Sequence, residues 1–262
     1  MVRVFRGKSI EGWMKISVIT AVYNAKETIA DAIESTLAQD YPNVELVVVD
    51  GASADGTTAL LEAFRDRIDI FISEPDKGIY DALNKGIRHA TGDVIGFLHA
   101  DDLFVSTDVL SRVAEVFADD SVDAVYGDLV YVSKAEPDRV IRYWQSGAYS
   151  VAKLKHGWMP PHPTFYMRRQ LYEKHGAFDT SFRIAADYDC MLRFLGNVEI
   201  HPVYIADVMV KMRLGGESNR SLRNIIRKSK EDYRALKKNG VGGVWALVWK
   251  NLSKLPQFVK KQ

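Results

Sequence analysis

The N-terminal half of the chain alternates short apolar runs with amphipathic segments, and this alternation leaves few possible folds. The apolar runs, typical of buried strands, lie at Lys15–Thr20, Glu45–Val49, Asp69–Ile72 and Asp93–Leu98. Segments with a helical spacing of apolar residues lie at Lys26–Ala38, Thr57–Arg65, Ile79–His89 and Val109–Phe117. In the third of these, Ile79, Leu83 and Ile87 share one face. Nearly continuous apolar strands joined by amphipathic helices predict a parallel sheet covered on both faces.

The pattern changes after a further apolar run at Asp123–Tyr126. Leu129–Val132 and Arg139–Tyr143, separated by a turn that contains proline, predict an antiparallel pair. Later elements are expected as strands at Thr164–Met167 and Val208–Leu214 and as helices at Arg168–His175, Tyr188–Leu195, Asn219–Lys238 and Val241–Lys260. The expected fold is α/β, with a doubly wound, mostly parallel sheet, a smaller antiparallel part and C-terminal helices.

The length of 262 residues suits one large domain with a small appendage. We expect this domain over residues 14–218, with a first half at 14–127 and a second half at 128–218. Residues 1–13 are expected to form an extension, since they precede the first strand-like run and lack the apolar core of a signal peptide. Residues 219–262 are expected to form a basic helical tail.

The charge is unevenly distributed along the chain. From Arg220 to Gln262 there are 12 Lys and Arg against 2 Asp and Glu, whereas the rest of the chain holds 23 against 32. A basic tail on an acidic body points to an anionic surface or partner, and Trp245 and Trp249 among its lysines suit an anionic membrane surface. A helix pair packed on the domain with a basic outer face is the alternative. No nucleic-acid partner is expected, because no recognised binding motif accompanies the charge.

Two further observations bear on location. No apolar stretch reaches the roughly 18 residues that a membrane span needs. Cys190 is the single cysteine, so no internal disulfide can form, and a reducing compartment follows. We therefore expect a cytoplasmic protein, with peripheral attachment to the inner face of the cell membrane as a further possibility.

Polar residues follow each predicted parallel strand, at the sheet edge where open α/β folds bind ligands. The residues at these ends are Thr20, Ala21, Tyr23 and Asn24 after the first strand, Asp50, Gly51 and Ser53 after the second, Lys77 and Gly78 before the third helix, and His99, Asp101 and Asp102 after the fourth strand. Adjacent carboxylates such as Asp101 and Asp102 raise each other's pKa unless a cation or hydrogen bonds neutralise them. A divalent cation completed by phosphate oxygens fits this pair, and a helix cap at Asp102 is the alternative.

Several segments together resemble the inverting family 2 glycosyltransferases of the GT-A fold. They are ITAVYN (Ile19–Asn24), VVVDGASADGT (Val47–Thr57), DKGIYDALNKGIRHATGD (Asp76–Asp93) and FLHADD (Phe97–Asp102). The resemblance implies that Thr20, Ala21 and Tyr23 line the base and ribose, that Asp50 accepts a hydrogen bond from the base with Ser53 beside it, that Asp76, Lys77 and Gly78 close over the nucleotide, and that Asp101 binds the ribose. It also implies that Asp102 holds a Mn²⁺ or Mg²⁺ ion on the diphosphate. The family often has Asp or Asn where this chain has His99, for which a packed, hydrogen-bonded histidine is expected.

The segment Phe182–Gly196 resembles the part of the family that carries the catalytic base. The usual Glu-Asp pair is here Ala186–Asp187, so the resemblance implies that Asp187 deprotonates the acceptor hydroxyl. A helix N-cap at Asp187 is the alternative, and Asp189 is the substitute base. The segment MRLGGES (Met212–Ser218) resembles a loop of the family that closes over the diphosphate, through Arg213 or through the glycines. Trp158 and His162 lie in the Pro-rich loop GWMPPHP and suit either sugar contact or the core.

The resemblance predicts an inverting glycosyltransferase with a nucleotide-sugar donor, a UDP-sugar being favoured, and a glycan or polyprenyl-linked acceptor. A nucleotidyltransferase is one alternative, although Ala21–Lys26 lacks the glycines of a phosphate-binding loop. A non-catalytic, membrane-associated protein that binds nucleotide sugars is the other. Donor binding and turnover distinguish these readings.

Overall fold

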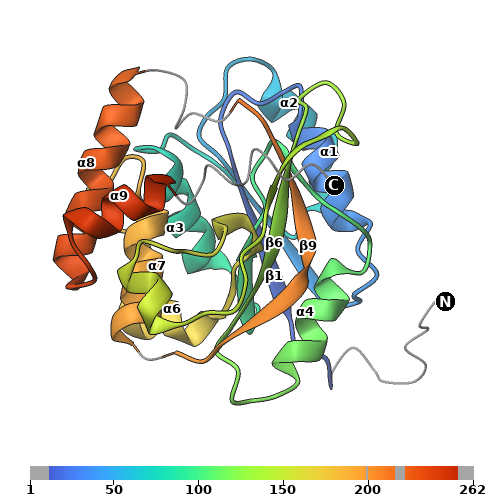
Figure 1. The fold of residues 1–262 in the computed structure, drawn as a ribbon. Helices are drawn as coiled ribbons and strands as arrows, with labels where there is room; N and C mark the ends of the chain where they lie inside the picture. The colour runs from blue at the N-terminus through green and yellow to red at the C-terminus, as the bar shows by residue number, and fades with distance from the viewer. Residues whose placement is uncertain (1–11, 199, 216–221, 253–262) are drawn as a thin grey trace.

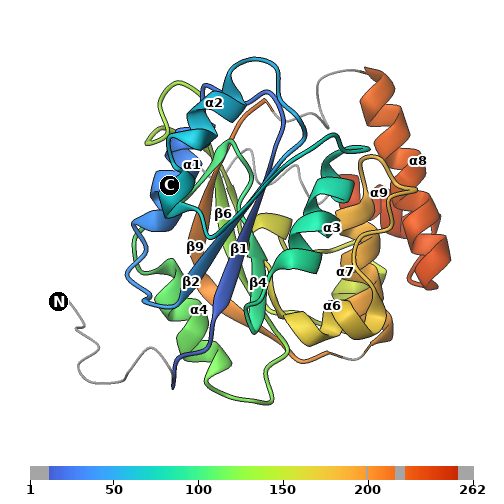
Figure 2. The ribbon, with the colours of Figure 1, turned by 180° about the vertical axis from the view of Figure 1, so that it is seen from behind.

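The computed structural model describes residues 12–198, 200–215 and 222–252. Within this part of the chain, nine strands form one curled sheet, in the order β3-β2-β1-β4-β8-β6-β9-β5, with β7 paired to β6. Helices α1, α2 and α4 lie on one side of the sheet, and α3, α6 and α7 lie on the other (Figures 1 and 2). The predicted α/β class with a mostly parallel sheet and an antiparallel part is confirmed.

The parallel half of the sheet follows the predicted strands closely. Its strands are β3 (Ile70–Ser73), β2 (Val44–Asp50), β1 (Ile16–Val22) and β4 (Val94–Phe97), joined through α1 (Ile29–Leu37), α2 (Thr57–Glu62) and α3 (Ile79–His89), while α4 (Val109–Phe117) follows later. Ile19 and Ala21 pack with α3, whereas Val22 packs with α1 and α2, as the two-residue period of a strand requires. The register pairs Val22 with Asp50 and Asp50 with Ser73, so these strands end at the same level.

The second half of the sheet is built around the long strand β6 (Ala124–Val132). It pairs antiparallel with β7 (Val140–Trp144) and β8 (Tyr166–Arg168), and parallel with β9 (Pro202–Arg213), which pairs antiparallel with β5 (Asp102–Phe104). The antiparallel pair predicted from Leu129–Val132 and Arg139–Tyr143 is confirmed. The apolar run that ends at Tyr126 and the run Leu129–Val132 are parts of one strand, β6. Strand β5 and helix α5 (Val151–Lys155) had no local signal.

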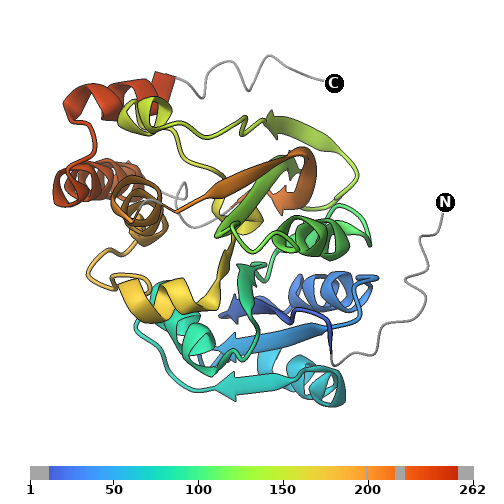
Figure 3. The ribbon, with the colours of Figure 1, turned by 90° about the horizontal axis from the view of Figure 1, so that it is seen from below.

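The C-terminal helices pack on the domain. Helices α8 (Leu222–Asn239) and α9 (Val244–Leu252) lie beside α7 (Ala186–Asn197), on the side of the sheet opposite to α1 and α4 (Figure 3). Lys250 of α9 and Asp232 of α8 form a buried ion pair of 2.9 Å. Ala235, Leu236 and Ala246 lie in the same buried cluster as α7. Among the described residues, no helix is both long and apolar enough to span a membrane.

Several sequence-based boundaries fall outside the described residues. These include most of the predicted extension (residues 1–11), the expected domain end at Ser218, and the part of the last predicted helix after Leu252. Trp13 is described, and its ring lies 5.5 Å from that of Tyr41. Trp13 therefore packs on the domain.

Candidate active site

The loops after β1 and β2 are joined by hydrogen bonds. The Asn24 backbone N–H donates to Ser53 Oγ at 2.8 Å, and the Ala54 N–H donates to Asn24 Oδ1 at 2.9 Å. Asn24 and Ala52 adopt positive φ angles of 49° and 58°, an uncommon conformation for residues other than glycine. Because the two loops brace each other, the exposed ring of Tyr23 projects from a fixed backbone.

The residues predicted to contact the base differ in exposure. Thr20 and Ala21 are 1% and 7% exposed, whereas Tyr23 is 64% exposed. Asp50 is fully buried at the end of β2, and its carboxylate accepts hydrogen bonds from Ser53 Oγ at 2.6 Å, Thr58 Oγ1 at 2.9 Å and Ser73 Oγ at 2.7 Å. A nucleobase that donated a hydrogen bond to Asp50 would have to displace the hydrogen bond of one of these three hydroxyls.

The segment before α3 meets the same edge of the sheet. The Gly78 N–H donates to Asp76 Oδ1 at 2.7 Å, and the φ of 117° at Gly78 strongly favours glycine. A Cβ added to Gly51 would collide with the Asp76 carboxylate and lie 3.3 Å from the Tyr23 ring. The structure therefore gathers Tyr23, Gly51 and Asp76 from three loops, with Lys77 exposed beside them.

Asp102 is the first residue of β5 and is fully buried. Its Oδ1 accepts a hydrogen bond from the Arg213 N–H at 3.3 Å, while Oδ2 has no hydrogen-bond partner in the described part of the chain. Burial, and secondarily the charge of Asp101, raise the pKa of Asp102 well above its usual range. A buried carboxylate oxygen without a donor fits a cation ligand, since a cation would offset the cost of ionisation.

The described residues supply too few ligands to hold a cation alone. No group of three or more His, Cys, Asp or Glu residues among them is arranged to bind a metal. A cation at Asp102 would therefore need oxygen ligands from a bound substrate, which suits a diphosphate. The helix-cap alternative for Asp102 is wrong, because the residue begins a strand.

Arg213 is buried next to Asp101 and Asp102. Its side chain is 4% exposed and donates to Asp31 Oδ2 of α1 at 2.5 Å and to the Asp101 carbonyl at 3.3 Å. Arg213 therefore ties β9 to α1 and to the turn that carries Asp101. The prediction that it closes over a diphosphate as part of a loop is wrong for this residue, and residues 216–218 of that loop lie outside the described part.

Asp187 lies in the first turn of α7, and residues of α3 and α8 hold this turn in place. The N-cap position is Ala185, so the N-cap alternative for Asp187 is wrong. The Tyr80 hydroxyl of α3 lies 2.6 Å from the Ile184 carbonyl oxygen and 3.2 Å from Asp187 Oδ1. Burial and the charge of Asp187 raise the pKa of Tyr80 well above 10, so its hydroxyl stays protonated as a donor.

A carboxylate from α8 completes this support. Glu231 accepts hydrogen bonds from the backbone N–H groups of Ile184 at 2.8 Å and Ala185 at 3.0 Å. Ala185 is the N-cap residue of α7 and Ile184 precedes it, so neither N–H group has an acceptor within the helix. Because Ala185 offers no side-chain cap, Glu231 acts as the cap of α7 from another helix, and it thereby positions the turn that carries Asp187.

Two histidines, His99 and His162, pack against each other near the end of β4. The rings of His99 and His162 are 5.6 Å apart, and His162 packs 4.9 Å from the ring of Phe97. Burial lowers the pKa of His99, and the charges of Asp101 and Asp187 both oppose this shift. The imidazole of His99 therefore experiences the charges of both Asp101, beside β5, and Asp187, at the start of α7.

The predicted packing of His99 is present, but its expected hydrogen bond is incomplete. His99 Nδ1 and His162 Nε2 are buried and have no hydrogen-bond partner among the described residues. Sequence reasoning left the role of His162 open, because a histidine in a Pro-rich loop has no periodic pattern that indicates its surroundings. Only the fold places it beside His99.

Other candidates have structural roles. Asp189 is fully buried and accepts hydrogen bonds from Lys238 Nζ at 3.0 Å and Asn239 Nδ2 at 2.9 Å, so the substitute-base assignment is wrong. Trp158 donates to the Ser146 carbonyl at 2.8 Å and packs 5.8 Å from the Tyr126 ring. Asp189 joins α7 to α8, and Trp158 belongs to the core.

Replacing His162 with Phe should flatten the acid dependence of stability. Burial lowers the pKa of His162 from 6.5 to about 4, so between these values the unfolded state binds the proton and the folded state does not. The contribution of His162 to stability is therefore fully present above pH 6.5 and is lost as the pH falls toward 4. Between about pH 7.5 and 5, wild type should lose about 2 kcal/mol more unfolding free energy than His162→Phe in urea titrations. Equal losses would contradict the assigned neutral imidazole.

The sequence model of the family "Glycosyl transferase family 2" matches residues 17–186, which ends one residue before Asp187. The PGL/p-HBAD biosynthesis glycosyltransferase of Mycobacterium tuberculosis is 30% identical over 208 residues, which cover 78% of each chain. An uncharacterised glycosyltransferase of the same organism, Rv1514c, is 33% identical over 184 residues, or 68% of each chain.

Solved structures share the fold. The crystal structure of S. aureus TarS residues 1–349 has a TM-score of 0.66 at 20% identity and covers 87% of this chain, which spans only 65% of the TarS chain. The mannosyltransferase PcManGT from Pyrobaculum calidifontis, in complex with GDP-Man and Mn²⁺, has a TM-score of 0.62 at 21% identity over 95% of this chain and 76% of its own. The extent of the family match and the identity to the mycobacterial enzymes show that this chain belongs to glycosyl transferase family 2 and is a glycosyltransferase.

Proposed function

We propose that the chain transfers a sugar from a UDP-sugar to a hydroxyl of a glycan or polyprenyl-linked acceptor, with inversion at the anomeric carbon. In this proposal Asp102 holds Mn²⁺ or Mg²⁺ and Asp187 is the general base. The observation that carries it is the buried Oδ2 of Asp102, which has no hydrogen-bond partner among the described residues and fits a cation ligand. A single displacement needs a cation-binding acid and a base at one site, and no protein nucleophile.

The nucleotide sugar is supported by the complexes of proteins with this fold. TarS has been crystallised with UDP and with UDP-GlcNAc, and PcManGT with GDP-Man and Mn²⁺. Tyr23, Asp50, Ser53, Lys77, Gly78 and Asp101 occupy the sheet edge that would receive the nucleotide. Since Thr20 and Ala21 are buried, we propose that they shape this edge from beneath and that Tyr23 provides the open aromatic surface.

In this proposal, proton transfer, positioning of the base and cation binding fall to different residues. Asp187 accepts the proton of the acceptor hydroxyl as its oxygen bonds to the anomeric carbon and the bond to the nucleotide breaks. Tyr80 and Glu231 hold the turn that aims Asp187. A cation held by Asp102, when bound, would stabilise the negative charge that develops on the departing diphosphate.

The anomeric configuration of the released sugar tests the proposal without a known acceptor. UDP-GlcNAc, an α-linked donor, is incubated with the enzyme and Mg²⁺, and water serves as the acceptor. Direct displacement releases the β anomer first, which ¹H NMR detects before mutarotation. Release of the α anomer first would contradict a single displacement. Donor binding without any turnover would favour the non-catalytic alternative.

We also propose that α9 rests on the inner face of an anionic membrane, where it would meet a polyprenyl-linked acceptor. Trp245 and Trp249 are 84% and 57% exposed on α9. Indole rings favour the membrane interface, and the excess of Lys and Arg in residues 220–262 would add attraction to anionic lipids. Deleting the helix would remove the buried Lys250–Asp232 pair, so point substitutions are the appropriate test.

Trp245→Ala/Trp249→Ala should lower co-sedimentation with anionic vesicles by about tenfold, because two interfacial aromatic side chains are lost. The matched control is Val140→Ala/Ile141→Ala, which truncates two exposed apolar residues on β7. Unchanged sedimentation of the tryptophan variant, or an equal loss in the control, would contradict the membrane contact.

A further inference from the structure

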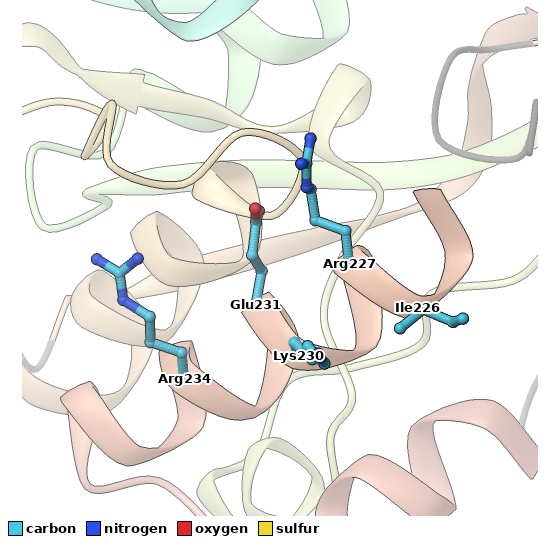
Figure 4. A pocket seen from close by; sticks show the side chains of 5 residues that line it. All are labelled: Ile226, Arg227, Lys230, Glu231 and Arg234. Carbon is cyan, nitrogen blue, oxygen red and sulfur yellow. The ribbon is translucent and has the colours of Figure 1, made fainter. Parts of the chain in front are cut away.

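Helix α8 borders a hollow of about 400 Å³ that is lined mainly by charged side chains. The lining residues are Ile226, Arg227, Lys230, Glu231 and Arg234 (Figure 4). Arg227, Glu231 and Arg234 follow a helical spacing that places them on one side of the helix, and Figure 4 shows their side chains rising from that side. This face of α8 is turned toward the loop that precedes α7, because Glu231 binds the backbone of that loop.

The charged groups of the hollow differ in how they are paired. Arg234 donates to the Ser181 carbonyl at 3.3 Å and lies 4.1 Å from the centre of the Phe182 ring, so it is held by the loop. Arg227 and Lys230 form no ion pair or hydrogen bond with any residue that the structure describes. By contrast, Lys238 on the same helix binds both Asp179 and Asp189. Arg227 and Lys230 are therefore cations beside a hollow that no described residue pairs with.

The balance of charge in the hollow indicates the class of ligand. Three cations face a single carboxylate, that of Glu231, which already accepts two backbone hydrogen bonds. The excess matches a phosphate monoester, which carries a charge of about −1.5 to −2 at neutral pH. The guanidinium of Arg227 offers paired N–H donors that suit phosphate oxygens, and Lys230 adds a flexible ammonium group.

The position of the hollow connects it to the acceptor side. Its Glu231 caps Ile184 and Ala185, and Asp187 follows two residues later in the same turn. The donor diphosphate is assigned to Asp102 on β5, a residue that does not line the hollow. We propose that this hollow binds a phosphate group of the acceptor and so holds the acceptor near Asp187. The inference rests on the proposed function, since it presumes that Asp187 faces the acceptor.

Isothermal titration with glycerol 1-phosphate tests the site directly. The titration is made with saturating UDP and Mg²⁺, so that the probe does not occupy the donor site. Wild type should bind the probe, and Arg227→Ala/Lys230→Ala should weaken binding by about tenfold or more because two charge-assisted contacts are lost. The control Lys228→Ala/Lys237→Ala removes the same charge from the same helix outside the hollow, and its affinity should stay within about twofold. UDP affinity should be equal in all three proteins.

Failure of wild type to bind the probe, or equal weakening in both variants, overturns the site. The same proteins are then sedimented with phosphatidylcholine vesicles with and without phosphatidic acid. A loss specific to Arg227→Ala/Lys230→Ala with phosphatidic acid supports a lipid-borne phosphate, whereas a loss confined to glycerol 1-phosphate supports a soluble one. If UDP itself does not bind, the proposed function fails, and the titration repeated without UDP still reports on the hollow.

Discussion

Asp187→Asn should lower the rate of UDP release from a UDP-sugar by about 10²- to 10⁴-fold, the usual contribution of a general base. Asn keeps the shape of the side chain and can still lie beside the Tyr80 hydroxyl, but it cannot accept the acceptor proton. The Kd for UDP should stay within about twofold of wild type, because only the acceptor side changes. Steady-state UDP release and isothermal titration of UDP measure the two quantities.

Asp189→Asn is the matched control, since it makes the same chemical change two residues along the same helix. Asp189 receives Lys238 and Asn239 from α8, so this variant should lose about 1–3 kcal/mol of stability. Its folded fraction should turn over at a near wild-type rate. A near wild-type rate for Asp187→Asn, or an equal rate loss in a fully folded Asp189→Asn, would remove Asp187 as the base.

Asp102→Asn should weaken the Mn²⁺-dependent binding of UDP but raise the stability of the metal-free protein. Without the carboxylate, the gain in UDP affinity on adding Mn²⁺ should fall by about 10- to 100-fold. The metal-free protein should become more stable near neutral pH by about 1–3 kcal/mol, because a buried carboxyl group with an unpaired oxygen is replaced by a neutral amide.

The sign of the stability effect follows from the raised pKa of Asp102. In the unfolded chain this carboxyl group ionises near its usual pKa of 3.8, whereas burial keeps the folded form protonated to higher pH. The unfolded state therefore releases the proton first, and Asp102 lowers stability as the pH rises above that value. Thermal melts of the two proteins should converge in acid and separate at neutral pH.

Asp128→Asn provides the contrast for this prediction. Asp128 is also buried, but its carboxylate accepts hydrogen bonds from Tyr143, Tyr204 and the Ser146 N–H. Its replacement should lower stability and leave the Mn²⁺ dependence of UDP binding unchanged. If Asp102→Asn behaved like Asp128→Asn, the cation-binding role of Asp102 would be wrong.

The parallel half of the fold was predictable because its signals are local. Apolar runs and the spacing of Ile79, Leu83 and Ile87 identified α3 and the strands around it without reference to the rest of the chain. The polar residues at the strand ends then followed from the rule that ligands bind at that edge of an open sheet. The structure gathers Tyr23, Gly51 and Asp76 there, as the strand order requires.

The features that were missed depend on residues distant in sequence. Strand β5 has three residues and exists through its pairing with β9, more than a hundred residues later. Arg213 fits a loop pattern by sequence, yet its partner Asp31 lies on α1. The charge of α8 was visible in the sequence, but only the packing shows that Glu231 caps α7 and that Arg227 pairs with no residue in the described ranges.

A crystal grown with UDP and Mn²⁺ tests the central claim most directly, through an anomalous difference map at the manganese edge. The account predicts a manganese peak in contact with Asp102 Oδ2, bridged to the diphosphate, with Asp187 facing the site from the opposite wall. A peak remote from Asp102, or UDP bound where Asp187 cannot reach the anomeric position, would contradict the account.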